Sequence, residues 1–168
     1  LAPRVPPVSL TAGFRLAGTG FDPATMNASV GLNGRFSGWE TTPRDTIALV
    51  AEIRGGSLLV DRLTGSLATA DVTAEGSWRF VAPQEGAVTY RLDVASLRPF
   101  GPYIPVIGDS IASGAVRAAG TLSGTLDRLR FAGQAVGGNL AVGGWRAQLI
   151  EGEYVVALGG GARPTAVV

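Results

Sequence analysis

The sequence predicts a fold built almost entirely from β-strands that pair with antiparallel neighbours. Apolar and polar residues alternate with a period of two in most segments, as strands with one apolar face require. Clusters of Gly, Asn and Asp separate these segments, and such residues are typical of tight turns. No segment shows a convincing 3.6-residue period over three helical turns. The regular spacing therefore favours a meander of antiparallel strands without crossover helices.

The first strands are expected in the N-terminal third of the chain. Alternation predicts strands at Leu10–Leu16, Val30–Phe36 and Ile47–Ile53. The stretches "GTGFDPATMN", "LNGRFSG" and "RGGS" contain the residues that turns require. The Asp22-Pro23 step is typical of a turn opener and not of an active site.

The clearest alternation lies in "ADVTAEGSWRF", residues 70–80, and in "AVTYRLDVA", residues 87–95. Acidic residues, Arg and Thr occupy every second position, so a one-residue slip of the strand would bury charges. The charged residues Asp71, Arg79, Arg91 and Asp93 are expected outside. The residues expected to point to a shared interior are Val72, Trp78, Val88, Tyr90, Leu92 and Val94.

The segment "SLRPFGPYIPVIGDS", residues 96–110, interrupts the alternation of apolar and polar residues. Its three prolines prevent it from forming a central strand, so it is expected to be a connection with about one helical turn. Alternation resumes at Val116–Leu122 and around Tyr154–Leu158, with "VGGN" and "VGGW" as further turns, and "VAPQEG" as a turn before the connection.

This connection divides the chain into two similar units. In the first, "GTGFDPATMNASVGL" precedes "GGSLLVDRLTGSL", and in the second, "GTLDRLRFAGQAV" precedes "GGNLAVGGWRAQL". Residues 1–168 are therefore expected to be a single fragment of a repetitive β domain. Its units lie at about 9–97 and 111–158 and are joined by a Pro-rich link at 98–110. Repeated β units indicate an elongated array in which each unit stacks on the next.

The composition argues against several classes of function. All 14 basic residues are Arg, there is no His or Cys, and the net charge is +1. Without His, Cys or Lys, the usual general bases, thiolate nucleophiles and Schiff-base amines are missing. The balanced charge gives no reason to expect nucleic acid as a partner. No Asp-rich calcium loop is present. The sequence predicts a protein that is not an enzyme and has no cofactor and no metal site.

The order of strands and glycines in the second half resembles a known family. The residues that carry the likeness are Tyr90–Leu97, Gly114–Leu126 and Gly138–Tyr154, and "RLAGTGFDPATMNASVGL" is similar to the same turn in the preceding unit. They are similar to the repeating β modules of the AsmA-like superfamily, in particular its TamB-type (translocation and assembly module) members. The N-terminal membrane anchor of that family is absent from these residues, so the chain looks like a piece of something larger.

The resemblance implies an elongated, curved, largely antiparallel sheet that folds into a taco-like hydrophobic groove, polar outside and apolar inside. Such proteins bridge the two membranes of diderm bacteria. The implied function is a non-enzymatic lipid-carrying module that moves phospholipid between the inner and outer membranes or supports outer-membrane assembly. The implied location is periplasmic, within a protein anchored in the inner membrane. The implied partners are phospholipid acyl chains and, through the parent chain, an outer-membrane barrel protein.

The apolar positions of the strands include many small residues, such as Gly34, Ala51 and Gly120, which leave space beside the larger ones. An acyl chain that fills such space leaves water at a gain of about 0.8 kcal/mol per CH₂. The residues expected to line the lipid groove are Phe14, Leu16, Val30, Leu32, Phe36, Ile47, Leu49, Ile53, Val72, Trp78, Val88, Tyr90, Leu92, Val94, Val116, Leu122 and Leu140.

Other interpretations remain open at this point. Small residues also occur where sheets bend, so the fold alternative is a closed β-sandwich or barrel with a packed interior. For function, the alternatives are a structural or adhesin-like β-repeat array and a fragment of an outer-membrane β-barrel. The three Trp residues fall beside turns or strand ends, where they are expected to cap a core.

Overall fold

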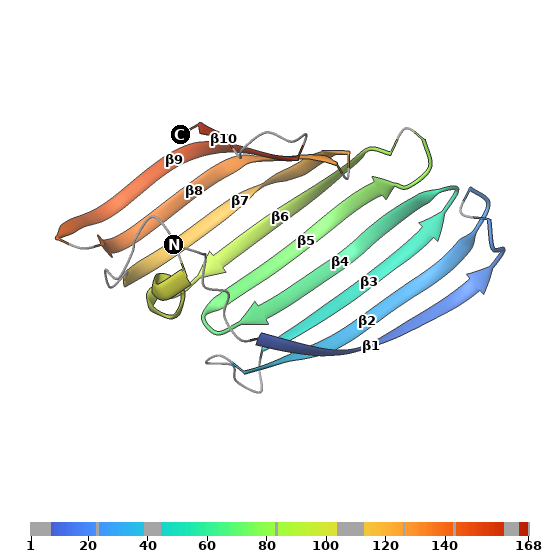
Figure 1. The fold of residues 1–168 in the computed structure, drawn as a ribbon, viewed down its shortest axis with the longest axis horizontal. Coiled ribbons are helices and arrows are strands. Elements are labelled where there is room, and N and C mark those ends of the chain that lie inside the picture. Colours follow the sequence, from blue (N-terminus) through green and yellow to red (C-terminus); the bar gives the residue numbers. More distant parts are fainter. Residues whose placement is uncertain are drawn as a thin grey trace.

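One antiparallel sheet contains all the strands of the computed structural model, which describes residues 8–22, 24–38, 45–82, 84–103, 113–125, 127–142, 144–159 and 165–167 (Figure 1). A short 3₁₀ helix, η1 (Arg98–Tyr103), lies between the sixth and seventh strands. The strands are β1 (Val8–Thr19), β2 (Asn27–Gly38), β3 (Thr46–Arg54), β4 (Ser57–Leu67), β5 (Ala70–Arg79), β6 (Gly86–Val94), β7 (Ser113–Thr125), β8 (Arg128–Val142), β9 (Trp145–Gly159) and β10 (Thr165–Val167).

The strands lie side by side in chain order, from β1 at one edge to β10 at the other (Figure 1). Each strand from β2 to β9 pairs in antiparallel fashion with the strand before it and the strand after it. The all-β, antiparallel, curved sheet expected from the sequence is confirmed. The closed sandwich or barrel is wrong for the described residues, because β1 and β10 do not pair and the sheet stays open.

Short turns join most of the strands. Gly55 and Gly56 form the two-residue turn between β3 and β4 with φ values of 52° and 76°, a region in which glycine avoids the strain of a side chain. Asp22 closes the turn before β2, since its side chain accepts a hydrogen bond of 2.9 Å from the backbone of Ala24. The turns predicted around 18–27, 54–57, 81–86 and 142–145 are confirmed.

Two predicted turns are wrong. Residues 32–38 lie inside β2 and residues 136–139 lie inside β8. At Gly34 the side chains of Leu10, Ala12 and Ile47 from the two neighbouring strands approach to 3.0 Å of the place where a Cβ atom would be. This glycine therefore makes room for its neighbours within a strand and does not bend the chain.

The Pro-containing connection contains the expected helical turn, which is η1. Residues 104–112, which include the rest of the link, lie outside the described residues. Strands β6 and β7 on either side of the connection pair directly, from Gly86 with Gly124 to Val94 with Val116. The sheet therefore continues without a break from the first predicted unit into the second.

Few side chains are fully buried. Among the described residues, the buried hydrophobic ones are Ala28, Ala51 and Val94, and the buried charged one is Asp45. The Asp45 carboxylate accepts a hydrogen bond of 3.0 Å from the backbone of Ala68, in the turn between β4 and β5. A second layer of structure would bury many Leu, Ile and Phe side chains, so the described residues form a single layer.

The predicted alternation of faces in β5 and β6 is present. The six apolar residues expected inside lie on one face, and the four charged residues lie on the other. The expectation of a shared interior is met only in part, because Val94 is buried whereas the other five are half-buried.

The Trp residues were all expected to cap a core, but the structure places them in different surroundings. Trp78, at the end of β5, lies against Gly86 and its indole nitrogen is buried. Trp145, at the start of β9, is 54% exposed, so it caps nothing in the described residues. Trp39 lies outside the described residues.

The assignment of faces predicts unequal effects for two adjacent substitutions in β6. Val88 is half-buried between Gly76 and Leu122, whereas Ala87 is exposed between Ser77 and Ser123. We expect Val88→Asp to lower the free energy of unfolding by about 2 kcal/mol, because its carboxylate is partly removed from water, and Ala87→Asp to change it by less than about 0.5 kcal/mol. Urea denaturation measures both. Equal losses would contradict the assignment.

Candidate functional site

The strand register aligns apolar side chains in rows that cross the sheet. Residues that pair directly in an antiparallel sheet lie on the same face. We call the face that carries Leu49 and the residues in register with it the apolar face, and the opposite one the polar face. One row on the apolar face runs across nine strands, through Phe14, Leu32, Leu49, Leu63, Ala74, Tyr90, Gly120, Gly133 and Tyr154.

A parallel row beside it has the same character. It runs through Leu16, Val30, Ala51, Val60, Gly76, Val88, Leu122, Phe131 and Val156. No residue in either row carries a charge. Charged residues of the same strands lie on the polar face, among them Arg117 and Asp93, which form an ion pair of 3.0 Å, and Arg54 and Glu52, which form one of 2.5 Å. Exposed pairs of this kind contribute little to stability, so they mark the solvated side of the sheet.

Sixteen of the seventeen residues predicted to line a groove share this apolar face. The register aligns these sixteen in rows across β1–β3 and β5–β7. Phe14 and Leu16, on the edge strand β1, are 80% and 52% exposed, whereas most of the others are half-buried by their neighbours. Leu140 lies beyond a bulge in the β7–β8 pairing, with its Cδ1 atom 2.5 Å from where a Cβ atom of Gly137 would be.

Sequence reasoning missed the part of the apolar face that β4, β8 and β9 supply. The register adds residues of these strands to the rows, among them Leu58, Val60, Leu63, Leu129, Phe131, Tyr154 and Val156. In β4 a bulge at Asp61 and Arg62 shifts the register between Val60 and Leu63. The extra residue keeps both apolar side chains on the same face although they are three positions apart.

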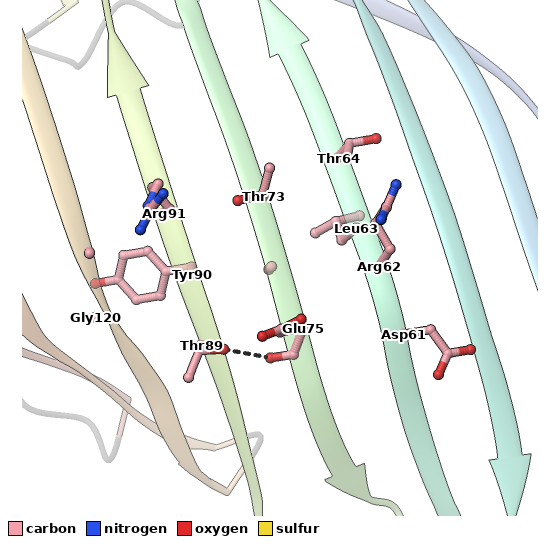
Figure 2. Close-up of a pocket in the computed structure, with 12 residues that line it drawn as sticks. Asp61, Arg62, Leu63, Thr64, Thr73, Glu75, Thr89, Tyr90, Arg91 and Gly120 are labelled. Carbon is pink, nitrogen blue, oxygen red and sulfur yellow. Dashed lines mark hydrogen bonds between the residues drawn. The ribbon is translucent and has the colours of Figure 1, made fainter.

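Two aromatic side chains cross the apolar face above a pair of glycines. The Tyr90 ring extends from β6 over β7 beside Gly120, as Figure 2 shows. Its hydroxyl is hydrogen-bonded to that of Tyr154 on β9, three strands away, and Phe131 on β8 contacts the Tyr90 ring edge to face with centroids 6.1 Å apart. Gly120 and Gly133 occupy the two positions between the tyrosines in the same row.

The glycines are required by the close approach of β7 and β8. A Cβ atom at Gly133 would overlap the carbonyl oxygen of Ala119 and lie 2.6 Å from the Cα atom of Gly120. A Cβ atom at Gly120 would in turn overlap the carbonyl oxygen of Ala132. The absent side chains leave the space that the two tyrosine rings cover.

The environment of Tyr90 keeps its phenol protonated. Burial of the side chain, followed by the hydrogen bond with Tyr154, raises the pKa of Tyr90 above its usual value near 10. Tyr90 is therefore uncharged at neutral pH. Any stability linked to this shift is present below pH 10 and is lost as the pH rises above it.

A hollow lies beside the β4 bulge, with residues of β4–β7 in its lining (Figure 2). It has a volume of about 650 Å³ and is bordered by Asp61, Arg62, Glu75 and Arg91 among others. The Thr89 hydroxyl donates a hydrogen bond of 3.1 Å to the backbone carbonyl of Glu75 (Figure 2). Acidic and basic groups are balanced here, so the hollow selects no ligand by charge. The described residues contain no cluster of three or more metal-ligating side chains.

Within the described residues, no helix has the length and apolar character needed to cross a membrane. Comparison of the chain with protein-family models, with curated proteins and with solved structures finds no match.

Proposed function

We propose that this chain is a non-enzymatic lipid-carrying module in which acyl chains lie on the apolar face while headgroups stay in water. The observation that carries the proposal is a pair of uncharged rows that each span nine strands and are covered by no second layer of the described residues. Monomeric soluble proteins rarely leave so large a contiguous apolar surface without a partner.

The chemistry of the face suits a lipid tail better than a protein segment with many polar groups. The rows offer Leu, Val, Ile and Phe side chains with Gly and Ala between them, and no charge that would need a counter-ion. Each CH₂ group that leaves water for this surface contributes about 0.8 kcal/mol. Binding driven in this way tolerates different headgroups and depends little on salt.

The resemblance to the AsmA-like, TamB-type modules supports the same function and adds its setting. In that setting the module belongs to an intermembrane bridge in the periplasm of a diderm bacterium. The parent protein is anchored in the inner membrane and supports outer-membrane assembly with an outer-membrane barrel protein as partner. The polar face, with its solvated Arg and acidic residues, faces the aqueous periplasm in this arrangement.

Adjacent residues of β3 provide the test. Leu49 lies on the apolar face, and Val50 lies on the polar face with 57% of its surface exposed. We expect a photocrosslinking amino acid at position 49 to capture phospholipid in cells and one at position 50 to capture none, with lipid identified by mass spectrometry. Capture at neither position, or equal capture at both, would refute lipid carriage and leave the structural array as the better account.

A further inference from the structure

In the two rows that cross β1–β9, the hydroxyls of Tyr90 and Tyr154 are the only side-chain oxygens. A hydrocarbon tail has neither a donor nor an acceptor, so it cannot form a hydrogen bond with these hydroxyls. Two phenylalanines would cover Gly120 and Gly133 equally well. The two oxygens therefore call for a functional explanation.

The tyrosine pair has one O–H donor that its internal hydrogen bond does not use. Each phenol carries one O–H hydrogen and two acceptor lone pairs. One hydroxyl donates to the other, and the second keeps its hydrogen for a different acceptor. No further hydrogen bond of either hydroxyl occurs within the described residues. A ligand on the apolar face that brings an acceptor would complete this bond.

The position of the pair restricts the chemistry of that acceptor. The neighbouring positions in the row are Ala74, Gly120 and Gly133, and the Phe131 ring lies against Tyr90. None of them offers a positive charge, and an anion removed from water without a cation is costly. The raised pKa of Tyr90 also shows an environment that disfavours a negative charge. The acceptor that fits is an uncharged oxygen.

We infer that the Tyr90–Tyr154 pair is a binding site for the ester carbonyl of an acyl lipid. This inference rests on the proposed function. A lipid whose tails lie along the rows presents an ester carbonyl at the junction of tail and headgroup, and this carbonyl accepts the free O–H of the pair. The pair gives an otherwise purely apolar face a preference for ester-linked lipids over ether-linked lipids of the same shape.

The test compares two lipids that differ only in this carbonyl. Purified protein is incubated with vesicles that contain equal amounts of diester and diether phosphatidylcholine of the same chain length, recovered, and extracted for mass spectrometry. We expect the native protein to hold the diester lipid in about fivefold excess, the ratio that one net hydrogen bond gives. The double variant Tyr90→Phe/Tyr154→Phe should hold both in nearly equal amounts, with similar total lipid.

The single variants act as matched controls. Tyr90→Phe and Tyr154→Phe each retain one hydroxyl with a free hydrogen, so each should keep the ester preference although the tyrosine pair is broken. A double variant that keeps the preference, a single variant that loses it, or a native protein that holds both lipids equally would overturn the inference and leave lipid carriage intact. A native protein that recovers neither lipid would overturn the proposed function and the inference with it.

Discussion

Leu49→Arg should reduce lipid capture on the apolar face more than tenfold. Leu49 lies half-buried on β3 between Leu32 and Leu63, and no acidic residue occupies its row. A guanidinium at this position would have to leave water without a partner whenever an acyl chain lies over it. Capture by a photocrosslinking amino acid at Leu63, the residue paired with position 49, measures the effect.

The matched control is Ala48→Arg. Ala48 adjoins Leu49 but lies on the polar face between Asn33 and Thr64, where the guanidinium of a further Arg can stay hydrated. We expect this variant to capture as much lipid at Leu63 as the native protein. A thermal melt of both variants separates loss of capture from loss of fold. Undiminished capture in a folded Leu49→Arg protein would show that lipid does not use the face.

Gly133→Ala should lower the free energy of unfolding by about 2 to 3 kcal/mol. The new methyl group would overlap the backbone of β7 at Ala119 and Gly120, and backbone cannot move aside as a flexible side chain can. The strands would have to separate, which would also strain the Tyr90–Tyr154 hydrogen bond above them. Urea denaturation measures the loss.

Gly138→Ala, on the same strand, controls for the change of residue type. No atom lies within 4 Å of the place that a Cβ atom would take at Gly138. Its stability should stay within about 0.5 kcal/mol of the native protein. Equal stability of the two variants would contradict the close approach of β7 and β8.

Much of the fold was predictable because alternation reports directly on a sheet with one apolar face. In β5, Val72 and Trp78 alternate with Asp71 and Arg79 without interruption, and the burial of the strand follows the same period. The Gly55-Gly56 turn was predictable for a similar reason, since two residues with positive φ are needed there. Both signals are local, and neither depends on distant parts of the chain.

The missed strands have identifiable physical causes. In β4 the bulge at Asp61 and Arg62 separates Val60 from Leu63 by three positions, so the period of two fails although the face is continuous. In β8 the glycines resemble turn residues, yet Gly133 is a glycine because β7 lies too close for a side chain. Such requirements arise only once two strands are in contact.

The open form of the sheet was expected from the family resemblance and not from alternation, and the tyrosine pair was beyond sequence reasoning. Alternation is the same in an open sheet and in a closed sandwich, because it shows which residues share a face of the sheet but not what covers that face. Tyr90 and Tyr154 are 64 residues apart, and only the combined register of β6, β7, β8 and β9 aligns them in one row.

The strictly sequential order of the strands has a consequence for how the chain folds. Every pairing joins neighbours in the sequence, and most close across a short turn, so each added strand orders few residues before its hydrogen bonds form. Topologies rich in such local pairings fold faster than those that wait for distant segments. A chain of this kind can add β2 to β1, then β3 to β2, as it emerges during synthesis. Each finished strand serves as the template for the next, and a nascent sheet of any length differs from the complete one only in where its free edge lies.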